Sequence, residues 1–265
     1  MVNPTLQWSM LTACLSPSTA IKKKLVIRER LRLFVQVCHG VQHAHQKAII
    51  HRDLKPSNIL VAEVDGKPTP RIIDFGLAKA TVPHAVGETL FTHVGAFLGT
   101  PGYMSPEQAD PGLQGVDTRT DVYSLGVILY ELLTGFLPFD STDWGKDRLD
   151  EVLWRLREFD PESPSVRVDK NRESATIHAD SCGTQTGPLV TSLRGDLDWI
   201  TMKALEKDRE RRYGTPSALV SDVERYLENR LVEARRASAV YRLGKYVHRH
   251  AVGVAVAAGS SSCLR

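Results

Sequence analysis

The sequence has only four cysteines in 265 residues, at Cys14, Cys38, Cys182 and Cys263. They lie far apart and form no C-x-x-C pair, so the sequence indicates neither a zinc site nor a disulfide framework. A reducing compartment fits this pattern best, and we expect a cytoplasmic protein. The net charge is only +3, which is too small to indicate a nucleic-acid partner.

Long hydrophobic runs are also missing. The apolar run A-V-G-V-A-V-A-A-G at residues 251–259 is about half of the ~20 residues that span a bilayer. A basic stretch from Arg235 to Arg249, with five Lys or Arg and no acid, precedes it. We therefore expect a membrane partner only if a longer form of the protein carries a transmembrane helix.

Residues 1–24 show no clear targeting signal. The stretch L-T-A-C at residues 11–14 is similar to a lipoprotein processing site. No Lys or Arg precedes it, and polar residues interrupt any apolar region, so we interpret residues 1–24 as an irregular leader.

Helical periodicity is the strongest local signal. Apolar residues at three- and four-residue spacing predict an amphipathic helix from about Arg28 to Lys47. The segment Val122 to Leu133 is apolar nearly all round and stops at Gly135, which predicts a helix buried in the middle of a domain. Further helices are expected at Asp147–Glu158, Asp196–Glu206 and Pro216–Glu228, the last with Thr215 as its N-cap.

The signal for strands is weaker. Two short β-branched runs, Ile59–Val61 and Arg71–Ile73, are joined by the turn-rich E-V-D-G-K-P-T-P and predict a small hairpin. From Asp160 to Leu193 large apolar residues are scarce and Ser, Thr, Pro and Gly are frequent, which predicts a long loop or insertion. The fold class is therefore expected to be mainly α.

The stretch H-R-D-L-K-P-S-N at residues 51–58 concentrates polar side chains, and D-F-G follows at residues 74–76. Phosphoryl transfer needs a carboxylate at the attacking hydroxyl, a cation at the moving phosphate and hard oxygen ligands for magnesium. Asp53, Lys55, Asn58 and Asp74 supply one group for each task. The pattern H-R-D-L-K-P-x-N fixes seven positions. A polar loop without this function would match it by chance on the order of once in a billion starting positions.

These motifs resemble the eukaryotic-type protein kinase family over about Leu25 to Leu231. The segment G-T-P-G-Y-M-S-P-E-Q-A at residues 99–109 is similar to the family's segment ending in A-P-E. The stretches D-V-Y-S-L-G-V-I-L-Y-E-L-L-T-G, G-D-L-D-W-I-T-M-K-A-L-E-K-D-R-E-R-R-Y and Y-R-L-G-K-Y-V-H-R-H most resemble bacterial receptor-like kinases. The K-P-S-N form of the loop, together with Thr100, looks like the Ser/Thr-specific branch.

The resemblance implies a protein-kinase-like C-terminal lobe with ATP and Mg²⁺ as cofactors. Asp53 would be the catalytic base and Lys55 the phosphate contact. Asn58 and Asp74 would be the magnesium ligands. Asp121 would brace the catalytic loop from the buried helix.

The resemblance also implies regulation by a phosphate on the segment between Asp74 and Glu107. Arg52 would ground that phosphate, which would order the segment. Thr92 is the first candidate for the phosphate and Thr89 the second. Thr100 is excluded as a phosphosite, because its hydroxyl would bridge Asp53 and Lys55.

The resemblance also bears on stability, through one ion pair and one helix cap. Glu107 would form a mostly buried ion pair with Arg212, which would tie the activation segment to the helical core. Family members tend to carry a Ser that caps the helix before the catalytic loop. Val26 occupies that place here, at an expected cost of about 0.5–2 kcal/mol.

The departure from the family lies at the N-terminal side. No G-x-G-x-x-G occurs in the sequence, and only a few residues separate Lys22 of A-I-K-K-K from the helix near Arg28, so Lys22 does not fit the ATP lysine. The N-terminal β-lobe is therefore expected to be missing. The expected organisation is a leader at 1–24, a kinase lobe at 25–231 with an insertion at about 160–194, and a basic juxtamembrane-like tail at 232–265.

Two functional readings stay open. The first is an ATP-dependent Ser/Thr protein kinase that phosphorylates protein Ser/Thr hydroxyls and is impaired on its own, with self-association through the surface that an N-terminal lobe would cover. The second is a catalytically inactive remnant or interaction module. A small-molecule phosphotransferase is disfavoured, because such enzymes lack the S-P-E segment and its Arg212 partner.

Overall fold

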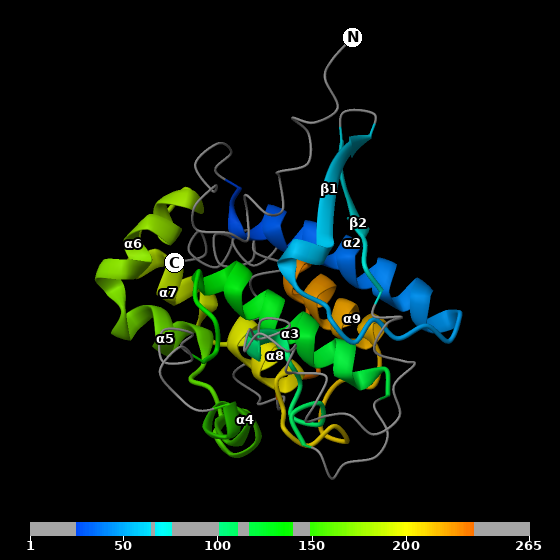
Figure 1. The fold of residues 1–265 in the computed structure, drawn as a ribbon. Helices are drawn as coiled ribbons and strands as arrows, with labels where there is room; N and C mark the ends of the chain where they lie inside the picture. The colour runs from blue at the N-terminus through cyan, green and yellow to red at the C-terminus, as the bar shows by residue number, and fades with distance from the viewer. Residues whose placement is uncertain (1–24, 65–66, 76–100, 111–116, 140–148, 236–265) are drawn as a thin grey trace, which may run out of the picture.

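The computed structural model describes residues 25–64, 67–75, 101–110, 117–139 and 149–235 (Figure 1). Helices dominate this part of the chain, and its sheet has two strands. The helices are α2 (Ile27–Gln46), α3 (Arg119–Thr134), α4 (Leu149–Glu158), α5 (Pro164–Lys170), α6 (Arg172–Ser181), α7 (Thr186–Leu193), α8 (Asp196–Ala204) and α9 (Pro216–Leu227). The 3₁₀ turns η2 (Pro56–Asn58) and η4 (Pro101–Tyr103) and the strands β1 (Ile59–Val64) and β2 (Lys67–Ile72) complete them. The predicted mainly α fold class is confirmed.

Helix α3 forms the centre of the core, as its apolar sequence predicted. It contacts α2, α5, α8 and α9, and it lies in the middle of the bundle in Figure 1. The helix ends at Gly135, whose φ of 77° is the left-handed conformation typical of a glycine C-cap. A Cβ on Gly126 would lie 2.8 Å from the Cβ of Ala204, so this glycine allows α3 and α8 to approach closely.

Helix α2 packs one apolar face against the core, and it leads directly to the catalytic loop. Leu31, Phe34 and Val37 on that face are at most 1% exposed. Val26 is the N-cap and provides no side-chain hydrogen bond, as the sequence predicted. Glu29 partly compensates, because its carboxylate accepts a hydrogen bond from the Val26 amide at 3.2 Å.

The hairpin is longer than predicted, because the strands continue through most of E-V-D-G-K-P-T-P. Val61 lies opposite Pro70 and Glu63 lies opposite Pro68. The amide of Ile73 donates to the carbonyl of Asn58. In an antiparallel ladder, hydrogen-bonded and non-hydrogen-bonded residue pairs alternate, so every second pair counted from this one is hydrogen-bonded. Both prolines fall on the pairs that need no amide donor, which explains how the strand tolerates them.

The long loop predicted between Asp160 and Leu193 is wrong. This stretch forms α5, α6 and α7, and these helices bury small or short apolar side chains. The buried set comprises Val168, Ala175, Ala179, Leu189 and Leu193, all 0% exposed. Two alanines, a valine and two leucines are enough to fill the narrow space between these short helices, so a low content of large apolar residues did not exclude a packed structure.

Arg30 connects this region to α2 and α3. It is only 2% exposed, and no carboxylate pairs with it in the described part of the chain. Its guanidinium donates to the carbonyls of Leu25 and Leu132 and to the hydroxyl of Ser181. Leu132 lies in the last turn of α3, where the helix dipole presents partial negative charge. Burial and the charge of Arg30 together lower the pKa of the neighbouring His178 to about 4.

Other predicted helices agree with the structure, including the N-cap of α9. The Thr215 hydroxyl accepts a hydrogen bond from the Ala218 amide at 3.2 Å. Within the described ranges, no helix has the length and apolar character that a membrane span requires. The leader at 1–24 and most of the tail at 232–265 lie outside the described residues, so both remain predictions.

Candidate active site

The loop between α2 and β1 carries most of the predicted catalytic residues, and one carboxylate fixes its backbone. Asp121, in the first turn of α3, is fully buried. It accepts hydrogen bonds from the backbone amides of His51 at 2.8 Å and Arg52 at 2.9 Å. The Nε2 atom of His45 lies 2.7 Å from the same carboxylate. These bonds hold Arg52 at a φ of 64°, a left-handed conformation that is costly for a non-glycine residue.

His51 joins the loop to the end of the hairpin. Its Nδ1 atom accepts a hydrogen bond from the Asp53 amide at 3.3 Å, so the ring proton lies on Nε2. Nε2 then donates to the carbonyl of Ile73 at 3.0 Å. The ring also packs against Phe75, with 4.7 Å between the ring centroids. The residue is fully buried, so it acts as a spacer between the two segments.

Asp53, Lys55 and Asn58 lie together on the loop, with Asp53 and Lys55 partly exposed and Asn58 buried. The ammonium of Lys55 is 3.0 Å from a carboxylate oxygen of Asp53, and the two side chains are 20% and 29% exposed. The amide nitrogen of Asn58 donates to the Asp53 carbonyl at 2.8 Å and lies 3.4 Å from its carboxylate. A partly exposed carboxylate held beside a cation can receive a hydroxyl proton next to a phosphate.

Asn58 and Asp74 fit the predicted role in holding magnesium. The Asn58 nitrogen is used by Asp53, which leaves its amide oxygen without a hydrogen-bond partner among the described residues. Asp74 is exposed, and the Ile73–Asn58 backbone bond joins its segment to the loop. Two hard oxygens suit Mg²⁺ when phosphates and water complete its six ligands. In the described ranges no group of three or more His, Cys, Asp or Glu side chains is arranged to hold a metal ion, so Asn58 and Asp74 would leave the other ligand positions to phosphates and water.

Glu107 and Arg212 form the ion pair that the sequence predicted. Two parallel bonds of 2.8 Å join the guanidinium to the carboxylate, and the side chains are 0% and 7% exposed. The Thr120 hydroxyl donates to Glu107 at 2.9 Å. Burial alone would raise the pKa of Glu107, but the bonds and charge of Arg212 outweigh burial and lower it. The pair ties residues 101–110 to the loop that precedes α9.

The sequence missed several polar contacts of residues 101–110. The Tyr103 hydroxyl donates to Glu131 at 2.6 Å, and the Ser124 hydroxyl donates to the Tyr103 carbonyl at 2.8 Å. The side-chain amide of Gln108 donates to the Arg52 carbonyl at 2.8 Å. Burial raises the pKa of Glu131 to about 7, although the Tyr103 hydrogen bond opposes this shift. A single acid within the apolar segment 122–133 was the available signal.

The regulatory residues are only partly placed. Arg52 is half-buried at the loop. Thr89, Thr92 and Thr100 lie outside the described residues, so their predicted roles are not tested by the structure.

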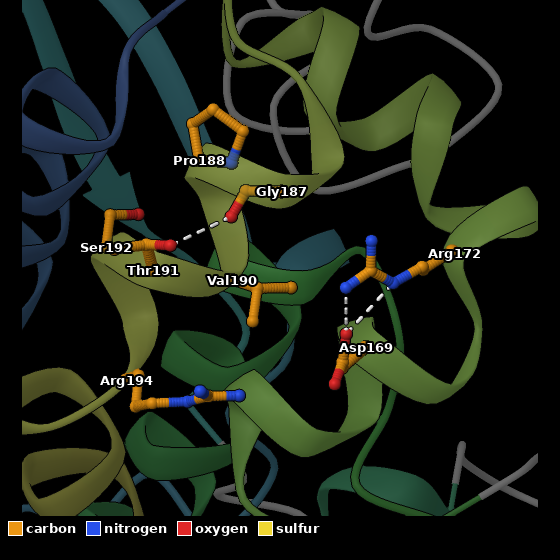
Figure 2. Close-up of a pocket in the computed structure, with 8 residues that line it drawn as sticks. All are labelled: Asp169, Arg172, Gly187, Pro188, Val190, Thr191, Ser192 and Arg194. Carbon is orange, nitrogen blue, oxygen red and sulfur yellow. Dashed lines mark hydrogen bonds and ion pairs between the residues drawn. The ribbon is translucent and has the colours of Figure 1, made fainter.

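A cavity of about 860 Å³ lies apart from these residues, on α5, α6 and α7 (Figure 2). Val190, Asp169, Arg172 and Arg194 contribute to its lining, and Arg172 is paired with Asp169. No predicted catalytic residue lines this cavity. The catalytic candidates lie instead on the partly exposed loop between α2 and β1.

Comparison with known proteins agrees with the geometry of this loop. The family described as the protein kinase domain matches residues 2–222. This match includes most of residues 1–24, but the predicted boundary at residue 25 lies at the edge of the described part and stays a prediction.

Individual relatives are bacterial serine/threonine-protein kinases. PknB of Mycobacterium tuberculosis is 34% identical over 198 residues, which are 75% of this chain and 26% of that protein. PrkC of Bacillus subtilis is 32% identical over 209 residues, which are 78% of this chain and 26% of that protein. Pkn1 of Myxococcus xanthus is 49% identical over 107 residues, which are 40% of this chain and 15% of that protein. The chain thus spans about a quarter of the length of PknB and PrkC.

The fold also matches a solved kinase. The crystal structure of the Mycobacterium tuberculosis PknI kinase domain, a double mutant, superimposes with a TM-score of 0.50 at 19% identity. The match covers 81% of this chain and 62% of the PknI chain. At this identity the similarity concerns the fold alone.

Proposed function

The chain belongs to the protein kinase family, and from that premise we propose that it transfers phosphate from Mg-ATP to serine and threonine hydroxyls of protein substrates. The observation that carries the proposal is the joint placement of Asp53, Lys55 and Asn58 on a loop braced by Asp121. The names of the relatives PknB, PrkC and Pkn1 support the serine/threonine class. We also propose that this catalytic part lies in the cytoplasm.

The chemistry follows from the positions of the side chains. Asp53 accepts a hydrogen bond from the substrate hydroxyl and takes its proton as the oxygen attacks phosphorus. Lys55, 3.0 Å from that carboxylate, compensates negative charge on the moving phosphoryl group. Asn58 and Asp74 would hold Mg²⁺, which neutralises charge on the phosphates when it is bound.

The 265 residues alone are proposed to be impaired. They contain no G-x-G-x-x-G, so the phosphates lack the backbone cover that kinases place over them. Water screens the charge interactions of a magnesium ion several-fold when its site is open to solvent. Phosphoryl transfer is also much slower when the reacting groups are not held in position. The missing motif also favours the second candidate, a non-catalytic interaction module. We propose in addition that the chain self-associates through the apolar surface that an N-terminal lobe would cover.

Nucleotide binding separates the two candidates. We would titrate Mg-ATP into this chain and into a fusion that carries a kinase N-terminal lobe before Leu25, and measure heat of binding. The kinase proposal expects metal-dependent binding in the fusion, weakened in its Asp74→Asn variant, and much weaker binding in the chain alone. A folded fusion that binds no Mg-ATP would support the interaction module instead.

A further inference from the structure

A second cavity, lined mainly by charged residues, lies at the end of α4. Its volume is about 370 Å³, and its lining includes Pro106, Arg157 and Lys207. The Lys207 ammonium donates to the Leu156 carbonyl and lies 4.9 Å from the centroid of the Phe139 ring. Lys207 is half-buried, so its amine borders the cavity and is held in one place by these two contacts.

Arg157 brings a guanidinium group to the lining of this cavity. Its Nε–H is buried and has no hydrogen-bond partner in the part of the chain that the structure describes. Its Nη1 atom is 3.7 Å from the Asp110 carboxylate, which is a long contact for an ion pair. A buried N–H without an acceptor is costly, so the guanidinium that lines the cavity is incompletely hydrogen-bonded in this structure.

We propose that Lys207 is a site of covalent acylation by small acyl phosphates, with Arg157 binding their phosphate group. The neutral Lys207 amine attacks the acyl carbon and forms an amide bond. The bond between that carbon and the phosphate oxygen breaks, and inorganic phosphate leaves with the electron pair. The excess proton on nitrogen passes to the phosphate or to water, so the reaction needs no oxidant or further reactant.

The surroundings of the amine increase the fraction of its neutral form. Burial lowers the pKa of Lys207 to about 8, and Arg212 acts in the same direction. Glu158 and Asp160 oppose the shift. The other charged groups of the cavity are Glu107, paired with Arg212, then Asp110, Arg157, Asp208 and Arg209. At pH 8 such a lysine is neutral about 150-fold more often than one with the ordinary pKa of 10.5.

Acylation would change the structure locally. It removes the positive charge over Phe139 and disrupts the bond to the Leu156 carbonyl near the end of α4. The Lys207 carbonyl also accepts a bond from Arg212 at 3.1 Å. The modification would therefore act beside the Glu107–Arg212 pair, at the junction of α4 with residues 101–110.

The test uses the unmodified folded chain and acetyl phosphate, and it measures the acetylation rate of each lysine by peptide mass spectrometry across pH 7–10. Lys170, which is exposed and pairs with Glu162, is the reference. At pH 8 we expect Lys207 to react about tenfold faster than Lys170. This factor is smaller than the increase in the neutral fraction, because a less basic amine is also a weaker nucleophile. Its rate should level off above pH 9. A Lys207 rate no higher than that of Lys170 would overturn the proposal.

A second reagent tests the part played by Arg157. Arg157→Gln should slow acetylation of Lys207 by acetyl phosphate several-fold and leave its reaction with an uncharged N-hydroxysuccinimide ester unchanged. An equal effect on both reagents would overturn phosphate binding by Arg157. Unfolding the chain in urea should abolish the difference between Lys207 and Lys170, and a difference that persists would show that the fold does not cause it.

Discussion

Replacement of Arg212 by alanine tests the packing of residues 101–110 most severely. The Arg212 side chain makes two bonds to Glu107 and donates to the backbone carbonyls of Arg119, Glu206 and Lys207. Its loss would leave the Glu107 carboxylate in a buried site where, among the described residues, the Thr120 hydroxyl is the remaining side-chain donor. Breaking a buried pair in this way costs about 3–5 kcal/mol, which urea unfolding can measure.

The pH dependence gives this prediction a sign. The pKa of Glu107 is lowered in the folded protein, so its contribution to stability is present above its ordinary value of 4.5 and is lost as the pH falls. In the Arg212→Ala variant, burial acts on Glu107 without the opposing charge, and the carboxyl can protonate. The variant should therefore lose more stability relative to the parent at pH 7 than at pH 4.

The neighbouring Arg211 is the matched control. It pairs with Glu206 at 3.2 Å, and its side chain is 69% exposed, so Arg211→Ala should cost less than about 1 kcal/mol. Equal unfolding midpoints for Arg212→Ala and the parent would refute the reasoning. So would a deficit for Arg212→Ala that grows as the pH falls.

Four other predictions concern single positions. Gly126→Ala should destabilise the chain by about 1–3 kcal/mol, because its Cβ would lie 2.8 Å from that of Ala204. Gly187→Ala in α7 should raise the melting temperature, because a Cβ at this position would have no atom within 4 Å and alanine has a higher helix propensity than glycine. Val26→Ser should stabilise α2 by about 0.5–2 kcal/mol in urea unfolding, and no change would show that Glu29 already caps the helix. The folded pKa of Glu131, raised to about 7, predicts stability that is lost as the pH rises from 4.5 through 7, and Glu131→Gln should flatten that dependence.

The predictable parts of the fold were those with strong periodicity or punctuation. Helix α3 followed from an apolar run that stops at Gly135, and α9 followed from Thr215 and Pro216. Helices α5 to α7 were missed, because they are short and each buries only a few apolar residues, so their periodicity is weak. Only the tertiary packing of Ala175 and Ala179 against neighbouring helices shows that this stretch has an interior.

The site was predictable where the spacing of side chains is local. Asp53, Lys55 and Asn58 lie within one loop, so their sequence spacing already places them close together. The contacts of Glu131 and His45 needed the fold, because both residues lie on helices whose apolar pattern hides them. His45 occupies a position with core-facing spacing, and a buried histidine needs a polar partner, which is Asp121 here.

The central claim is that Asp53 performs base catalysis in a serine/threonine kinase. Its most direct test is the transfer of labelled phosphate from Mg-ATP to a generic basic protein by the fusion that carries a kinase N-terminal lobe before Leu25, compared with its Asp53→Asn variant. We predict label on serine or threonine with the fusion, a loss of several powers of ten in the variant, and little transfer by the unfused chain. Equal transfer by the fusion and its Asp53→Asn variant would contradict it.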